Sequence, residues 1–165
     1  MKKEYKYASI FFAIIAVGII SISYFYDEVD LKRNTTNDIT AVDKTFLRTS
    51  PELKGISGYI NTSLEEIEQD MDGKVVLYDF WTYSCINCIR TLPYLTAWDE
   101  KYSDEGLVII GIHTPEFEFE KEFDNVVFAT KKFGIKYPVI QDNDKETWNE
   151  FQNRYWPRKY IADHE

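Results

Sequence analysis

Two cysteines, Cys85 and Cys88, are the residues of this sequence best suited to carry out chemistry. They are the only cysteines in the chain, and they stand where a strongly apolar run gives way to a helical pattern. Three residues apart on a first helical turn, their sulfurs can close a small disulfide ring, and the unpaired N–H groups and dipole of the helix favour a thiolate at Cys85. The spacing indicates a redox pair in which Cys85 attacks a partner's disulfide and the more shielded Cys88 resolves the mixed disulfide.

Two other uses of the cysteine pair compete with this interpretation. A disulfide with purely structural value is disfavoured, because so short a ring constrains the unfolded chain little. A structural metal site is disfavoured as well, because His113 and His164 lie outside any finger-like spacing. A copper metallochaperone that uses Cys85, Cys88 and His113 is kept as an alternative function, and no resident metal is expected.

Asp79 is the third candidate, because it interrupts an apolar run six residues before Cys85. An isolated carboxylate is costly to bury, and burial raises its pKa toward the range in which it can exchange a proton at neutral pH. We expect Asp79 to take the proton of Cys88 during resolution. The alternative is an exposed or salt-bridged aspartate at the end of a strand.

Alternating strands and helices are predicted to position these residues between residues 50 and 165. The capping pair Ser63 and Glu66 starts the first helix, Asn143 with Glu146 starts the last, and Pro93 interrupts the helix that follows Cys85. The alternation predicts an α/β fold, a mostly parallel sheet with helices on both faces. The expected strands cover residues 74–81, 107–112, 138–141 and 158–162, and the expected helices cover residues 64–71, 85–102, 120–133 and 143–154.

The first 49 residues predict a membrane tether. Residues 8–26 form an uncharged stretch of 19 residues, close to the length that a helix needs to cross a bilayer. Lysines in residues 1–7 keep that end in the cytoplasm, so residues 27–49 form a linker and residues 50–165 lie on the extracytoplasmic side of the cell membrane. A cleaved signal peptide is the alternative.

Charge excludes one class of partner and marks one surface. The net charge of −9 makes nucleic acid an unsuitable partner. Glutamates at 116, 118, 120 and 122 alternate with phenylalanines at 117, 119 and 123. This stretch could be a docking surface, but we expect a solvated acidic face with packed phenylalanines.

The segment Asp79-Phe80-Trp81, followed by Cys85, Cys88 and Pro93, resembles the thioredoxin superfamily. Longer stretches, GLVIIGIHTPEFEFEK and YWPRKYIAD among them, are similar to its TlpA-like branch and most of all to the thioredoxin-like domain of DipZ-type proteins. The likeness covers residues 50–163. It implies a thioredoxin fold with a strand-helix insert at about residues 113–134, and a chain that stops before the family's last strand and helix.

The resemblance also assigns roles. It makes Cys85 the nucleophile, Cys88 the resolving thiol and Asp79 the proton acceptor. It places Trp81 beside the site as a packing residue, and it makes Pro157 the cis-proline that offers backbone groups to an extended substrate. Trp81, Trp156 and Pro157 are therefore the expected substrate-binding residues.

The expected function is a membrane-anchored reductase of disulfide-containing extracytoplasmic proteins, such as apocytochromes in cytochrome c biogenesis. A membrane electron donor such as a CcdA-like protein would supply the electrons, and no cofactor is needed beyond the Cys85–Cys88 disulfide. Ile86 and Asn87 replace the Gly-Pro of thioredoxin, so the direction of electron flow is not inherited. A disulfide oxidase or isomerase is the alternative within the same chemistry.

Overall fold

The two most apolar runs of the sequence form the centre of the sheet. In the computed structural model, which describes residues 47–163, these are β2 (Val75–Trp81) and β3 (Leu107–His113), and they pair in parallel along their length. Both strands are almost entirely buried, as expected of parallel strands with helices on each side. A compact unit begins at Arg48.

Three shorter strands complete a five-stranded sheet of order β1-β4-β3-β2-β5. These are β1 (Gly58–Ile60), β4 (Val139–Gln141) and β5 (Arg158–Ala162). Only β2, β3 and β4 run in parallel, whereas β1 is antiparallel to β4 and β5 is antiparallel to β2. The sheet is therefore mixed, which corrects the mostly parallel sheet that was expected, and β1 was too short to be predicted.

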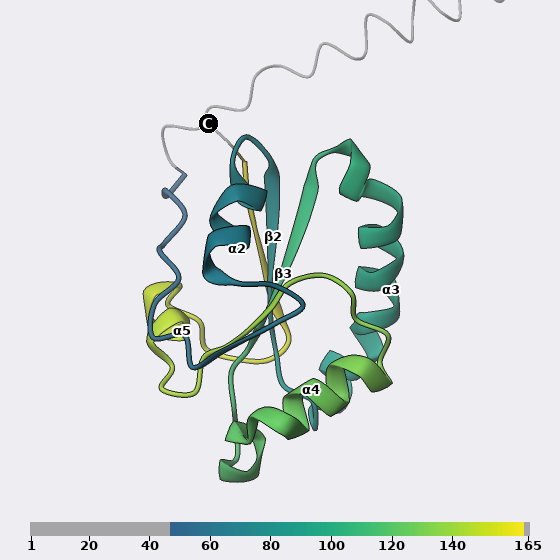
Figure 1. Ribbon diagram of the computed structural model, residues 1–165. Coiled ribbons are helices and arrows are strands. Elements are labelled where there is room, and N and C mark those ends of the chain that lie inside the picture. Colours follow the sequence, from purple (N-terminus) through teal and green to yellow (C-terminus); the bar gives the residue numbers. More distant parts are fainter. Residues whose placement is uncertain (1–46, 164–165) are drawn as a thin grey trace, which may run out of the picture. The chain divides into compact units, whose positions relative to one another are not determined.

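Helices cover both faces of the sheet, as predicted (Figure 1). On one face, α3 (Ile86–Tyr102) and α4 (Phe123–Lys132) pack in a cluster with Leu77 and Trp81 of β2. On the other face, α2 (Leu64–Met71) and α5 (Glu146–Glu150) pack with Tyr78 and Phe80. Because side chains alternate along a strand, Asp79 shares the α3 face with Leu77 and Trp81.

The helix boundaries confirm some expectations and correct others. The Ser63 hydroxyl accepts the Glu66 N–H at 3.3 Å, which confirms the predicted cap of α2. Helix α3 continues unbroken through Pro93 and leads into a 3₁₀ turn, η2 (Ser103–Glu105). The next helix starts at Phe123 rather than at residue 120, because a separate 3₁₀ turn, η3 (Glu118–Lys121), precedes it.

Two further expectations need correction. The segment 113–134, expected to hold a strand-helix insert, holds the end of β3, η3 and α4 and no further strand, whereas β4 lies where the strand at residues 138–141 was expected. Helix α5 is much shorter than expected, and its first N–H groups are bound by the Asp142 carboxylate rather than by Asn143.

The predicted membrane segment at residues 8–26 and most of the linker at 27–49 lie outside the described residues. None of the helices within residues 47–163 combines the length and the apolar character needed to cross a membrane.

Candidate active site

Cys85 and Cys88 lie at the start of α3, directly after the loop that leaves β2. Cys85 is the N-cap residue of the helix, and its Sγ atom accepts the Cys88 N–H at 3.3 Å. Cys85 is partly exposed, whereas Cys88 has no exposed surface, and both thiols are free. A partner's disulfide can therefore reach the first sulfur and not the second.

Cys88 needs help to lose its proton. Burial raises the pKa of its thiol far above the usual range, and the hydrogen bond to Cys85 and the nearby charge of Asp79 act in the same direction. A buried thiol is a poor nucleophile until a base accepts its proton. The base has to lie inside the protein, because Cys88 does not contact solvent.

Asp79 is buried as expected, but it is not isolated: it forms the salt bridge that the alternative interpretation allowed, with Lys159. It is fully buried on the face of β2 that α3 covers, and its Oδ2 atom has no hydrogen-bond partner among the described residues. Burial raises the pKa of Asp79, and the neighbouring ammonium group of Lys159 opposes that rise. The charge of Asp79 acts on Cys88, so the structure brings the predicted base into the electrostatic neighbourhood of the cysteine pair.

Lys159 is a site residue that the sequence analysis missed. It is paired with Asp79 across the antiparallel β2–β5 ladder, and its Nζ atom lies 2.7 Å from Asp79 Oδ1. The same ammonium donates to Thr91 Oγ1 at 3.2 Å, and the Thr91 hydroxyl donates to the Cys88 carbonyl at 2.9 Å. Its only sequence signal was a charge in a short predicted strand, and the pairing depends on the register of two distant strands.

The predicted substrate-binding residues lie around the same cluster. Trp81 is fully buried, so it packs beneath the site, with its ring 5.2 Å from that of His113 in an edge-on contact. Trp156 is partly buried against the cluster that contains Cys88 and Trp81. The Trp156–Pro157 peptide bond is cis, as the family resemblance implied.

His113 is a packed residue at the end of β3. Its ring is stacked on Tyr83 at 5.5 Å, its Nε2 atom lies 3.4 Å from Thr82 Oγ1, and burial lowers its pKa to about 4. In the part of the chain that the structure describes, no three His, Cys, Asp or Glu side chains form a group that could hold a metal ion. Cys85, Cys88 and His113 therefore do not converge as the copper alternative requires.

The expected solvated acidic face with packed phenylalanines is only partly correct, because the phenylalanines at 117, 119 and 123 are exposed rather than packed. Three of its glutamates are exposed as expected, whereas Glu120 is buried. Its side chain has no exposed surface: Oε1 accepts the Ser84 hydroxyl at 2.5 Å, and Oε2 accepts the N–H groups of Glu116 and Phe117 at 2.6 and 3.0 Å. Burial alone would raise the pKa of Glu120, but the hydrogen bonds that it accepts outweigh this effect, and its pKa is lowered. An ionised carboxylate therefore fixes the residue that precedes Cys85.

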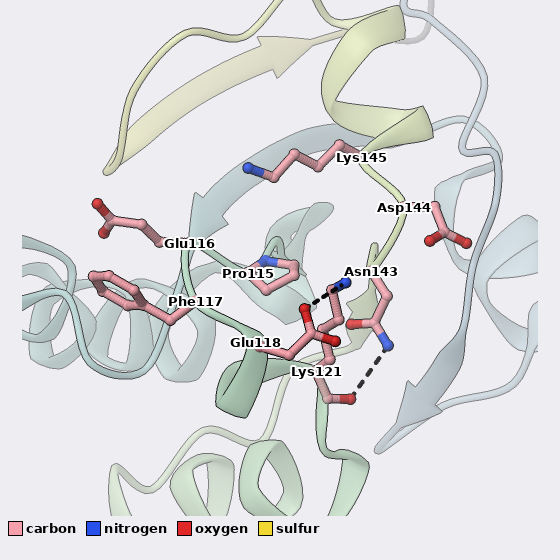
Figure 2. Close-up of a pocket in the computed structure, with 8 residues that line it drawn as sticks. All are labelled: Pro115, Glu116, Phe117, Glu118, Lys121, Asn143, Asp144 and Lys145. Atoms are coloured by element: carbon pink, nitrogen blue, oxygen red, sulfur yellow. Dashed lines mark hydrogen bonds and ion pairs between the residues drawn. The ribbon is translucent and has the colours of Figure 1, made fainter.

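A polar pocket of about 360 Å³ lies between two segments near the site (Figure 2). One wall follows β3, and the other is the loop before α5. An ion pair of 2.9 Å joins Lys121 to Glu118 in the first wall, and Asn143 donates to the Lys121 carbonyl at 3.2 Å. The lining residues are Pro115, Glu116, Phe117, Glu118, Lys121, Asn143, Asp144 and Lys145.

Comparison with known proteins places residues 73–163 in a family model described as thioredoxin-like. The DipZ protein of Mycobacterium tuberculosis is 49% identical over 117 residues, which are 70% of this chain but only 17% of DipZ. The thiol-disulfide oxidoreductase YkuV of Bacillus subtilis is 28% identical over 113 residues, 68% of this chain and 75% of YkuV. The solution structure of a thioredoxin-like protein in the oxidized form matches with a TM-score of 0.62 and 26% identity, over 70% of this chain and 76% of that one.

Proposed function

Because this chain belongs to the thioredoxin-like family, we propose that it is a thiol-disulfide oxidoreductase with Cys85 and Cys88 as its redox centre. One observation carries the proposal. A partly exposed sulfur at a helix N-terminus stands beside a fully buried one, and a buried carboxylate lies on the same face of the sheet. The names of YkuV and of other relatives, which describe thiol-disulfide oxidoreductases, support the same chemistry.

The reaction uses the two sulfurs in sequence. The Cys85 thiolate attacks one sulfur of a substrate disulfide, forms a mixed disulfide and releases the other substrate sulfur as a thiolate. The Cys88 thiol then transfers its proton to Asp79, and its thiolate attacks Cys85 Sγ. The Cys85–Cys88 disulfide forms, the second substrate sulfur leaves as a thiolate, and the substrate has gained two electrons.

Asp79 and Lys159 govern the proton in the second step. The carboxylate must be ionised to accept the Cys88 proton, and burial works against ionisation. The Lys159 ammonium, 2.7 Å away, offsets part of that effect and keeps the carboxylate able to act as a base. Asp79 is thus the catalytic base, and Lys159 is a positioning residue.

In this proposal the chain works as a reductase on the extracytoplasmic side of the membrane. The apolar segment 8–26, with lysines before it, supports an anchor. A membrane dithiol carrier such as a CcdA-like protein would re-reduce the Cys85–Cys88 disulfide, and disulfide-containing proteins would be the substrates. Recovery of the full-length chain in the soluble fraction of its cells would contradict the anchor.

The experiment that tests this function is the reduction potential of the Cys85–Cys88 pair, measured by equilibration with dithiothreitol and glutathione buffers. A reductase should show a potential near that of thioredoxin, about −270 mV, whereas a potential near about −120 mV would identify an oxidant. A Cys88→Ser variant is the control, because it cannot close the ring. Failure to form any reversible disulfide would contradict the oxidoreductase assignment itself.

A further inference from the structure

Two phenylalanines are held in solvent close to the redox loop. Phe117 and Phe119 flank the start of η3, their rings lie parallel with centroids 5.6 Å apart, and they are 50% and 54% exposed. The ring of Phe119 also lies 6.2 Å from that of Tyr83, two residues before Cys85. Adjacent exposed rings are costly in water, and such apolar patches commonly mark interaction sites.

The turn that carries these rings is fastened to the loop before Cys85. The buried Glu120 carboxylate binds Ser84 on one side and the N–H of Phe117 on the other. The Tyr83 hydroxyl donates to the Phe119 carbonyl at 2.9 Å, and Asn125 donates to the same carbonyl at 3.2 Å. The exposure of the rings is therefore a fixed feature of the fold.

The surroundings of the pair are acidic. Glu116, Glu118, Glu122 and Asp124 are all exposed, and the one cation of this stretch, Lys121, is paired with Glu118. The pocket beside Phe117 is lined by three carboxylates, those of Glu116, Glu118 and Asp144, and by two lysines (Figure 2). Lys121 is paired with Glu118, and the Lys145 ammonium lies over the Trp156 ring. A basic side chain would gain from this potential, whereas an anionic membrane surface or a second copy of this acidic chain would be repelled.

The pocket also adjoins the expected substrate-binding segment. Lys145 lies in the far wall of the pocket, and its Nζ atom is 5.0 Å from the centre of the Trp156 ring. Trp156 directly precedes Pro157 in the sequence. The platform formed by Phe117, Phe119 and the pocket is thus linked to the loop before Cys85 on one side and to Trp156 on the other. A chain bound along Pro157 would be continuous with this platform.

We propose that this platform binds an extended segment of the substrate protein that carries an apolar side chain and a basic side chain near its reactive cysteine. The aromatic pair takes the apolar side chain, and the carboxylates of Glu116 and Asp144 at the pocket take the basic one. The inference rests on the proposed function and adds the class of substrate to it.

The test compares the full-length protein with a Phe117→Ser, Phe119→Ser double variant. The control variant is Phe128→Ser, because Phe128 is 69% exposed on α4 and lies outside the platform. Three disulfides serve as substrates: a peptide with Phe and Lys beside its cysteine, the same peptide with Ser and Asp, and hydroxyethyl disulfide. The readout is kcat and KM for each, with dithiothreitol restoring the Cys85–Cys88 dithiol after each cycle and its direct reaction with the substrate subtracted.

We expect the parent to prefer the Phe/Lys peptide and the double variant to lose about tenfold in kcat/KM on it, mainly through KM, as for truncated aromatic hot spots. Hydroxyethyl disulfide should react equally with parent, double variant and control. Equal rates of the parent on the two peptides, or an equal loss on all three substrates, would overturn the platform alone. If the parent reduces none of the three, the proposed function fails and the platform falls with it.

Discussion

Among the individual residues, Lys159 has the most direct influence on the proposed chemistry. Its ammonium forms an ion pair with the Asp79 carboxylate, which has no solvent contact, and it also donates to Thr91, whose hydroxyl donates to the Cys88 carbonyl. The same cation therefore contacts the base directly and reaches the resolving cysteine through one side chain.

A Lys159→Met change should shift the pH dependence of resolution upward. Burial raises the pKa of Asp79, and the Lys159 ammonium opposes that rise. Without the ammonium the pKa rises further, so a higher pH is needed to ionise the carboxylate. Stopped-flow release of substrate from the Cys85 mixed disulfide, followed between about pH 5 and pH 9, measures the shift. The resolution rate at neutral pH should fall.

Two controls separate this role from a structural one. Lys136→Met removes an exposed lysine and should leave the pH profile unchanged. In an Asp79→Asn background, Lys159→Met should cause no further shift, because the titrating group is already absent. An unchanged profile combined with lower stability would show that Lys159 only supports the fold.

His113 should make the fold sensitive to mild acid. Its pKa is about 4 in the folded state and 6.5 when unperturbed, so the unfolded chain binds more protons between these values and stability falls as pH falls through that range. Across the whole range, the free energy of unfolding should fall by about 3 kcal/mol because of this residue. Urea melts of parent and His113→Gln at several pH values should give a flatter curve for the variant, and parallel curves would contradict the assignment.

Among the secondary structure elements, α5 depends on a residue outside it. The helix has five residues, and its N-cap, Lys145, has a left-handed backbone (φ 61°) and makes no side-chain cap. Asp142 instead accepts the N–H groups of Thr147 and Trp148 at 3.2 and 2.9 Å, and the Thr114 hydroxyl at 3.1 Å. The carboxylate thereby joins the ends of β3 and β4 to the helix.

Asp142→Ala should lower the free energy of unfolding by about 2–3 kcal/mol, because three buried donors lose their acceptor. Asp144→Ala is the matched control: this exposed neighbour caps no helix in the described chain, and its loss should change stability by less than about 0.5 kcal/mol. Urea unfolding measures both. Similar losses for the two variants would mean that Asp142 does not cap α5.

At the scale of the whole molecule, the features that could be predicted from the sequence are those that depend on a continuous stretch of chain. Local patterns of this kind predicted the buried strands β2 and β3. They also predicted that Cys85 and Cys88 lie at the start of α3. Asp79 stood out because one charge interrupted a buried run.

What escaped prediction depends on contacts between distant segments. The direction of β5 and its register with β2, which bring Lys159 to Asp79, are properties of the assembled sheet. Glu120 looked like one of several alternating surface glutamates, and only the approach of Ser84, 36 residues earlier in the chain, makes it a buried anchor. Short strands such as β1 carry too few residues for a pattern.

The burial of Cys88 has a consequence for durability under oxidative stress. A peroxide can reach the partly exposed Cys85 and convert it to a sulfenic acid, but it cannot reach Cys88. The sheltered thiol stays available to condense with that sulfenic acid, which forms the disulfide and releases water before irreversible oxidation occurs. The difference in exposure that sets the order of the two catalytic steps therefore also converts oxidised Cys85 into the Cys85–Cys88 disulfide, which is an ordinary intermediate of the cycle.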